Sequence, residues 1–240
     1  MDIIKGKLTN QPWMGLVYAT PGFGKSTWAS QADSPLFLDL ENGLKRIDCN
    51  RTPHLTTYSM FKDGLGFACT NDFKTIVVDS VDALEFLLIQ KILDEEKGSK
   101  QSLGDFGYGK GYELLVANWS LVLGMFDRAK NEFNRNILLI GHEQIQRYED
   151  PASDAYDRYA LNIHKKSASL VISRCDFVFF GKDEAIIKKR EGGMAEKGRG
   201  IGTGRKLLHT REAPAWVAKN RFNLPAEVEL SPDVFNLLNQ

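Results

Sequence analysis

One stretch of this chain decides its fold: Ala19-Thr20-Pro21-Gly22-Phe23-Gly24-Lys25-Ser26. It follows the phosphate-loop pattern G-x-x-x-x-G-K-[ST], with alanine in place of the first glycine. The apolar residues 14–18 before it are typical of a buried strand, and residues 26–31 after it suit the first turns of a helix. Because a helix N-terminus presents unpaired N–H groups and a partial positive charge, a loop in this place can wrap a phosphate. The stretch therefore predicts a nucleotide-binding loop; the alternative is a glycine turn before a helix.

The residue types of this loop predict how it would hold its ligand. Gly22 and Gly24 allow the backbone to approach closely and to take positive φ. Lys25 would reach the β and γ phosphates, and Ser26 would hold Mg²⁺. The predicted ligands are ATP and Mg²⁺. The residues expected to contact the nucleotide are Thr20, Pro21, Gly22, Phe23, Gly24, Lys25, Ser26 and Thr27.

Length and composition favour a single α/β domain over residues 1–240, with 42% hydrophobic residues to build its core. Cys49, Cys69 and Cys175 stand far apart and form no C-x-x-C pair. This argues against a zinc site or a disulfide framework and fits a reducing compartment. The first seven residues lack a signal-peptide apolar region, and no apolar run is long enough to span a bilayer. We therefore expect a soluble, cytoplasmic protein with no membrane partner.

The charge of the chain is balanced overall but not along its length. Lys and Arg number 31, as do Asp and Glu, so the formal net charge is zero. Between residues 182 and 221, 11 Lys and Arg face 5 Asp and Glu, which leaves a net charge of +6. A basic segment on a neutral chain fits a contact with a polyanion, and it fits a solvated hairpin equally well.

Apolar runs alternate with helical patterns along the chain, which predicts a mostly parallel central sheet flanked by helices. A C-terminal β-hairpin extension is expected from residues 185–190 and 205–211, with residues 191–204 at its tip. Two long segments, residues 98–111 and 144–162, are expected to be loops, and loops of this length are usually functional or disordered. The expected strands are 14–19, 35–40, 74–79, 136–141 and 176–181, and the expected helices are 25–31, 81–97 and 112–133.

Polar side chains follow three of the expected strands. Asp79 ends an apolar run about fifty residues after the phosphate loop and is a candidate Walker B ligand of Mg²⁺, with a helix N-cap as the alternative. Glu41 is the candidate general base that would activate water, with a solvated carboxylate as the alternative. His142 is a candidate sensor of the γ-phosphate, although an isolated histidine is more often a structural hydrogen-bonding group.

At these residues the chain resembles the RecA-type recombinase core, from about residue 12 to residue 225. The order of the motifs is similar: phosphate loop, acidic strand end, Ile76-Val77-Val78-Asp79-Ser80-Val81, glycine-rich loop, helix, polar strand end and long loop. The resemblance implies a RecA-like P-loop NTPase fold in which the acid matching Glu41 activates water. It also implies that the loops 98–111 and 144–162 line a DNA filament axis. His142-Glu143 stands where recombinases carry Asn-Gln, and the residue at this place couples nucleotide to the second loop.

A second motif lies near the C-terminus. Lys219-Asn220-Arg221-Phe222 resembles the Lys-Asn-Arg-Phe motif of RadA-type ATPases, in which basic residues act on nucleotide at a subunit interface. The resemblance implies that Lys219 and Arg221 are catalytic across that interface and that the chain forms a homo-oligomer, as a ring or a filament. The alternative is a basic patch near a strand end.

The short core, with Gly107-Tyr108-Gly109-Lys110-Gly111-Tyr112, looks most like phage-encoded minimal RecA-core proteins, which are single-strand annealing recombination ATPases. This implies DNA-stimulated ATP hydrolysis, with single-stranded DNA as a partner and a single-stranded-DNA-binding protein as a second candidate partner. Two other functions stay open: a helicase-like or packaging motor, and a nucleotide-gated adaptor with little turnover. The expected DNA contacts mix aromatic rings with cations and are Phe106, Tyr108, Lys110, Tyr112, Arg147, Lys188, Lys189 and Arg190.

Overall fold

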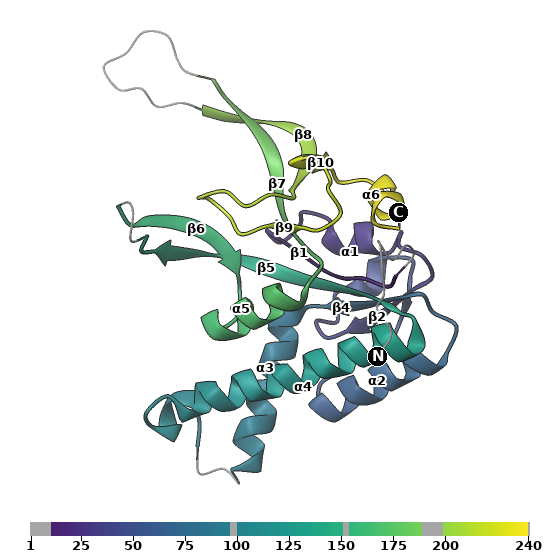
Figure 1. The fold of residues 1–240 in the computed structure, drawn as a ribbon, viewed down its shortest axis with the longest axis vertical. Coiled ribbons are helices and arrows are strands. Elements are labelled where there is room, and N and C mark those ends of the chain that lie inside the picture. The colour runs from purple at the N-terminus through teal and green to yellow at the C-terminus, as the bar shows by residue number, and fades with distance from the viewer. Residues whose placement is uncertain (1–10, 97–99, 151–153, 189–198, 240) are drawn as a thin grey trace, which may run out of the picture.

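A computed structural model describes residues 11–96, 100–150, 154–188 and 199–239, which form a twisted sheet with helices on both faces (Figure 1). The strand order is β10-β8-β7-β1-β5-β4-β2-β3, and two further strands pair beside it, β6 with β5 and β9 with β7. The strands from β3 to β7 in this order run parallel, whereas β8, β10, β6 and β9 pair antiparallel. The bounds are β1 Met14–Ala19, β2 Pro35–Asp39, β3 Asn50–Arg51, β4 Thr75–Asp79, β5 Asn136–Tyr148, β6 Tyr156–Leu161, β7 Phe177–Lys188, β8 Arg199–His209, β9 Lys219–Asn220 and β10 Glu227–Glu229.

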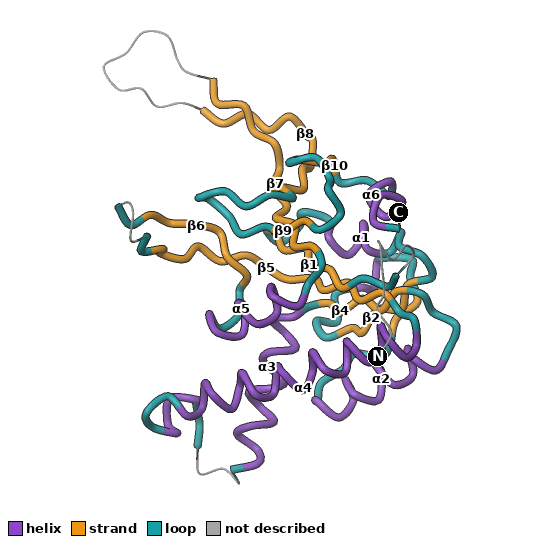
Figure 2. The backbone as a smooth tube through the Cα atoms, viewed as in Figure 1, coloured by secondary structure: helices purple, strands orange, loops and turns teal. Residues whose placement is uncertain are grey.

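The helices divide the core into two layers, one on each face of the sheet (Figure 2). The larger layer packs four helices against the sheet: α2 (Tyr58–Thr70), α3 (Val81–Glu95), α4 (Lys110–Phe133) and α5 (Lys165–Arg174). The smaller layer contains α1 (Lys25–Ala29) and α6 (Asp233–Leu238). Two short 3₁₀ helices, η1 (Leu44–Arg46) and η2 (Leu103–Phe106), lie in the connections.

Burial on both faces explains why the central strands are continuous apolar runs. All six residues of β1 and all five of β4 are buried, as expected for parallel strands covered by helices. The longest helix, α4, turns one stripe to the core, in which Leu115, Trp119, Val122 and Phe126 recur every three or four residues and are fully buried. Ser80 and Thr57 cap the starts of α3 and α2 by accepting hydrogen bonds from backbone N–H groups.

The predicted fold class is confirmed: the fold is α/β with a mostly parallel sheet, helices on both faces and a C-terminal β-hairpin of β7 and β8. The expected loop over residues 144–162 is wrong, because β5 continues to Tyr148 and pairs with β6 in a second hairpin. The expected loop over residues 98–111 is shorter than predicted, because η2 and the first turn of α4 occupy its second half. The helices α2, α5 and α6 were not predicted. Residues 189–198, at the predicted tip of the C-terminal hairpin, lie outside the described residues.

Within the described ranges, no helix combines the length and the apolar character needed to cross a membrane.

Candidate nucleotide-binding site

The phosphate loop joins the end of β1 directly to the start of α1. Gly22 has φ of 81° and Gly24 has φ of 99°, which are conformations that favour glycine. Phe23, between them, is buried and turns its ring into the smaller core layer, so only its backbone faces the site. The strand–loop–helix arrangement predicted around Lys25 and Ser26 is present.

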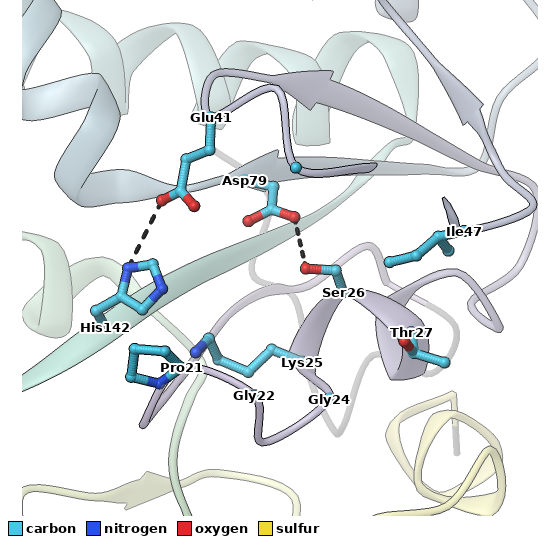
Figure 3. Close-up of a pocket in the computed structure, with 11 residues that line it drawn as sticks. Pro21, Gly22, Gly24, Lys25, Ser26, Thr27, Glu41, Ile47, Asp79 and His142 are labelled. Atoms are coloured by element: carbon cyan, nitrogen blue, oxygen red, sulfur yellow. Dashed lines mark hydrogen bonds and ion pairs between the residues drawn. The ribbon is translucent and has the colours of Figure 1, made fainter. Parts of the chain in front are cut away.

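A pocket of about 400 Å³ opens above this loop (Figure 3). Its size falls in the range of small-molecule sites. The loop lies there beside Glu41 just after β2, Asp79 at the end of β4 and His142 on β5. These residues meet because the carboxyl ends of parallel strands lie at the same edge of a sheet. The lining residues are Pro21, Gly22, Gly24, Lys25, Ser26, Thr27, Glu41, Gly43, Ile47, Asp79 and His142. Thr20 lies outside the lining and contributes a carbonyl to the loop.

Lys25 is folded back onto its own loop. Its Nζ donates hydrogen bonds to the carbonyl oxygens of Ala19, at 2.9 Å, and Thr20, at 3.1 Å. The side chain is buried, and this burial lowers the pKa of the ammonium group. An anion in the pocket would stabilise the charged form of Lys25, so the site suits a phosphate.

Ser26 and Asp79 bring two oxygen atoms together beside the loop, and hard cations such as Mg²⁺ bind oxygen ligands. The Ser26 hydroxyl donates a hydrogen bond of 2.7 Å to Oδ2 of Asp79 (Figure 3). Burial raises the pKa of Asp79 to about 6 in spite of that hydrogen bond, and the nearby Glu41 and Asp39 add to the rise. A hydroxyl and a carboxylate are ligand types that Mg²⁺ takes in nucleotide sites, and a cation would stabilise ionised Asp79. The residues therefore fit Mg²⁺. The N-cap role considered for Asp79 is taken by Ser80.

The candidate base, Glu41, lies on the other side of the pocket beside His142. The Glu41 carboxylate accepts a hydrogen bond from the Ser80 hydroxyl, and its Oε1 lies 3.6 Å from Nδ1 of His142. His142 is fixed by Asp82, which accepts hydrogen bonds from the backbone N–H and lies 2.7 Å from Nδ1. The hydrogen bond that His142 donates to Asp82 raises the pKa of His142. Burial alone would raise the pKa of Asp82, but its hydrogen bonds with His142 outweigh burial and lower it.

Asp82 was not predicted as a site residue. It lies in the first turn of α3, three residues after Asp79, where acidic residues are common because of the helix dipole. Its position after the Walker B strand is the one sequence signal that could have marked it.

Lys219 and Arg221 do not reach the phosphate loop of their own chain. They lie in and next to β9, which pairs with the beginning of β7 at the amino ends of the parallel strands, the edge opposite the pocket. Lys219 Nζ donates to the carbonyls of Ile172 and Ser173 at the end of α5, at 3.2 and 3.0 Å. Arg221 donates to Oδ1 of Asp176 at 3.0 Å. A role for both residues at a neighbour's nucleotide stays a prediction.

The aromatic residues predicted to contact DNA have different surroundings. Tyr108 is fully exposed, with φ of 47°. Phe106 packs against the larger core layer, and the Tyr112 ring stacks on His164 with centroids 4.6 Å apart. Phe106 and Tyr112 therefore pack within their own chain, whereas the Tyr108 ring is free to meet a partner.

The cations predicted to contact DNA are only partly described. Lys110 is exposed at the start of α4. Arg147 is exposed on β5 and lies 3.5 Å from Asp157 on β6. Lys188 ends β7, and Lys189 and Arg190 lie outside the described residues.

One family model covers most of this chain. The model of a family described as an AAA domain matches residues 11–222. That range contains the phosphate loop, Glu41, Asp79 and His142. Among solved structures, the crystal structure of the RadB recombinase is similar, with 12% sequence identity and a TM-score of 0.48 over 93% of this chain and 90% of that one. A search of curated proteins gave no match.

Proposed function

Since the chain belongs to the AAA domain family, we propose that it is a single-domain ATPase that binds ATP with Mg²⁺ and hydrolyses the γ-phosphate bond. The observation that carries this proposal is the hydrogen bond of 2.7 Å between Ser26 and Asp79 directly beside the phosphate loop. It brings a loop hydroxyl and a strand-end carboxylate to one point of a pocket that also contains Lys25 and Glu41.

Lys25, the loop backbone and two oxygen ligands would bind the nucleotide. Lys25 would exchange the carbonyls of Ala19 and Thr20 for phosphate oxygens, which removes the penalty that burial places on its charge. Ser26 and Asp79 would hold Mg²⁺, either directly or through water. The ion would neutralise charge on the phosphates. These residues orient the γ-phosphate toward Glu41.

Glu41 would accept the proton of the attacking water. Its side chain is 34% exposed, so a water molecule can reach it, and the Ser80 hydroxyl fixes its orientation. His142 would register the γ-phosphate, because it lies between Glu41 and Asp82 and ends the parallel-paired part of β5, directly before the β5–β6 hairpin. Loss of the γ-phosphate could thus affect the β5–β6 hairpin through strand β5.

We further propose that the chain acts on single-stranded DNA in phage recombination, by annealing or strand pairing, as a homo-oligomer and together with a single-stranded-DNA-binding protein. The β5–β6 hairpin, the β7–β8 hairpin and the beginning of α4 all project toward the same side, on the left in Figure 1. β5 runs toward that side, and its parallel neighbours β1 and β4 run with it, so the phosphate loop opens there too. Tyr108, two residues before α4, and Ile145 on β5 are exposed at 103% and 69%.

Phosphate release measured with and without single-stranded DNA, over a series of salt concentrations, tests this function. We expect Mg²⁺-dependent hydrolysis that DNA stimulates, with DNA affinity falling as salt rises. Directional strand displacement without annealing would instead indicate a motor. A response to nucleotide with no DNA binding would indicate an adaptor.

A further inference from the structure

A lysine from the C-terminal hairpin contacts the phosphate loop from outside the pocket. Lys206 on β8 donates hydrogen bonds to the carbonyl oxygen of Phe23, at 2.7 Å, and to that of Gly22, at 3.3 Å. Its ammonium group also lies 5.2 Å from the centre of the Phe23 ring. Lys206 is not among the residues that line the pocket, so it binds the loop on the side away from the nucleotide.

The ring of Phe23 is held by the other strand of the same hairpin. A Cβ atom built on Gly181 of β7 would lie 2.5 Å from the Phe23 ring, closer than real contacts allow. The ring therefore packs directly on the backbone of β7, and a side chain at position 181 would displace it. Both strands of the hairpin thus fix the middle of the phosphate loop.

The position of Lys206 is itself fixed by the C-terminal segment. Its carbonyl oxygen accepts a hydrogen bond of 2.8 Å from Leu230 N–H, and Leu230 lies next to Gly24. The adjacent Ser231 accepts a hydrogen bond of 2.8 Å from the Trp28 indole of α1. Lys206 therefore rests on the segment that also supports the helix after the loop.

The geometry of a peptide bond explains what such a contact does. In a trans peptide the C=O and the following N–H point in opposite directions. A cation bonded to the Phe23 oxygen on the outer side therefore turns the Gly24 N–H toward the inner side, where Gly24 lines the pocket. A charge-assisted hydrogen bond is stronger than a neutral one and holds this orientation before the nucleotide arrives.

We infer that Lys206 is a positioning residue for nucleotide binding, which holds the carbonyl of Phe23 so that the Gly24 N–H faces the phosphates. This inference rests on the proposed ATP site. It assigns to the β7–β8 hairpin a direct mechanical connection to the phosphate loop of its own chain.

The test compares Lys206→Met, which keeps the apolar stem over Phe23 but removes the donor, with Arg205→Met. Arg205 is the neighbouring cation on β8, and it pairs with Glu184 and Glu229 rather than with the loop. We expect Lys206→Met to raise the Kd and KM for MgATP about tenfold, the size of one lost charge-assisted hydrogen bond, with kcat within about threefold of wild type. Lys206→Arg should recover most of the affinity, and Arg205→Met should bind like wild type.

Titration calorimetry and phosphate release on the same preparations, with melting curves, give these values. Equal Kd and KM in Lys206→Met and wild type would refute the positioning role, as would a loss that Arg205→Met shares. If Lys206→Met is too unstable to purify, the rise in Kd and KM for MgATP is measured in Lys206→Gln instead. Wild-type protein that binds no nucleotide would instead refute the proposed function, so the two failures are distinguishable.

Discussion

Two carboxylates at opposite edges of the same sheet, half-buried Asp176 and buried Asp79, behave in opposite ways. Asp176, at the amino edge, accepts hydrogen bonds from Met14 N–H at 2.9 Å, Lys130 at 3.1 Å and Arg221 at 3.0 Å. Burial alone would raise its pKa, but these hydrogen bonds and charges outweigh burial and lower it. Asp79, at the carboxyl edge, has a carboxylate that accepts a hydrogen bond from the Ser26 hydroxyl, and burial raises its pKa to about 6.

The difference distinguishes a charged group that is stabilised by its own chain, Asp176, from one that a bound cation would stabilise, Asp79. At the amino edge, Lys130 and Arg221 stabilise the charged form of Asp176. At the carboxyl edge, Lys25 and Asp79 are buried in protonation states that burial disfavours. Ionisable groups whose pKa values are shifted by burial concentrate at functional sites, because a bound ligand can stabilise their charged forms.

The largest expected effect is on turnover. Glu41→Gln removes the general base and keeps the phosphate loop, so kcat should fall by about 10²–10⁴-fold while the affinity for ATP changes little. Phosphate release and titration calorimetry separate the two quantities. Glu95→Gln, at the far end of α3 in an exposed ion pair with Lys91, is the matched control and should retain activity. Unchanged turnover in Glu41→Gln would remove this residue from the mechanism.

The comparison of the two carboxylates predicts stability changes of opposite sign. Asp79→Asn removes a charge that burial disfavours, so the free energy of unfolding without nucleotide should rise at pH 8, by no more than about 3 kcal/mol. Asp176→Asn weakens charge-assisted hydrogen bonds and should lower it by about 1–3 kcal/mol. Urea unfolding of both variants measures the pair. Changes of the same sign would contradict the distinction between the edges.

The dependence on pH sharpens the same test. The pKa of Asp79 lies above its ordinary value of 3.8, so the ionisation penalty grows as pH rises from about 4 through about 6. The gain in Asp79→Asn should therefore shrink as pH falls through this window. The pKa of Asp176 lies below 3.8, so its stabilisation persists above that pH and disappears as pH falls through the lowered value. Melting temperatures between pH 3.5 and 8 should show the Asp79 trend, while the loss caused by Asp176→Asn should stay nearly constant above pH 4.

A smaller effect is expected on DNA affinity. If the exposed Tyr108 ring stacks on a base, Tyr108→Ala should weaken binding of single-stranded DNA by roughly 1–3 kcal/mol. Lys110→Ala should flatten the salt dependence by about 0.7 units of log–log slope. Phe67→Ala, which removes an exposed aromatic ring from α2, is the control. Fluorescence anisotropy with a labelled oligonucleotide measures each variant, and wild-type binding by both Tyr108→Ala and Lys110→Ala would exclude this surface.

The smallest stability effect is expected at Arg221. Its side chain is 58% exposed, so loss of its ion pair with Asp176 should change stability by less than about 1 kcal/mol. If Arg221 acts on a neighbour's nucleotide, Arg221→Ala should nevertheless lower ATPase activity at unchanged ATP affinity. Mixing it with Glu41→Gln should then restore some activity at mixed interfaces. Co-assembled mixtures that never exceed the separate variants would make Arg221 purely structural.

Local sequence patterns were enough to predict the carboxyl edge of the sheet, at which the phosphate loop lies. The buried strands β1 and β4 are uninterrupted apolar runs, and the loop between β1 and α1 has a fixed motif. The helix α2 was missed because Gly64 and Gly66 weaken its helical pattern, whereas packing of Phe61 and Leu65 against the sheet compensates for them.

The β5–β6 hairpin and the contacts of Asp82 and Lys206 depend on tertiary structure. The hairpin projects beyond the sheet, so both of its faces carry polar residues and no apolar alternation marks it. Lys206 meets Phe23 across 183 positions of sequence, a contact that no local pattern contains. The sequence could thus predict most residues that line the candidate pocket, but not the contacts that hold them in place.

The central claim is that the pocket above the phosphate loop binds MgATP through Lys25 and Asp79. Titration calorimetry of MgATP into wild-type protein and into Lys25→Ala tests it most directly. The account predicts saturable, Mg²⁺-dependent binding to wild type, and a loss of that binding in a Lys25→Ala protein that still melts cooperatively. Equal affinity in the two proteins, or no binding to wild type with Mg²⁺ present, would contradict it.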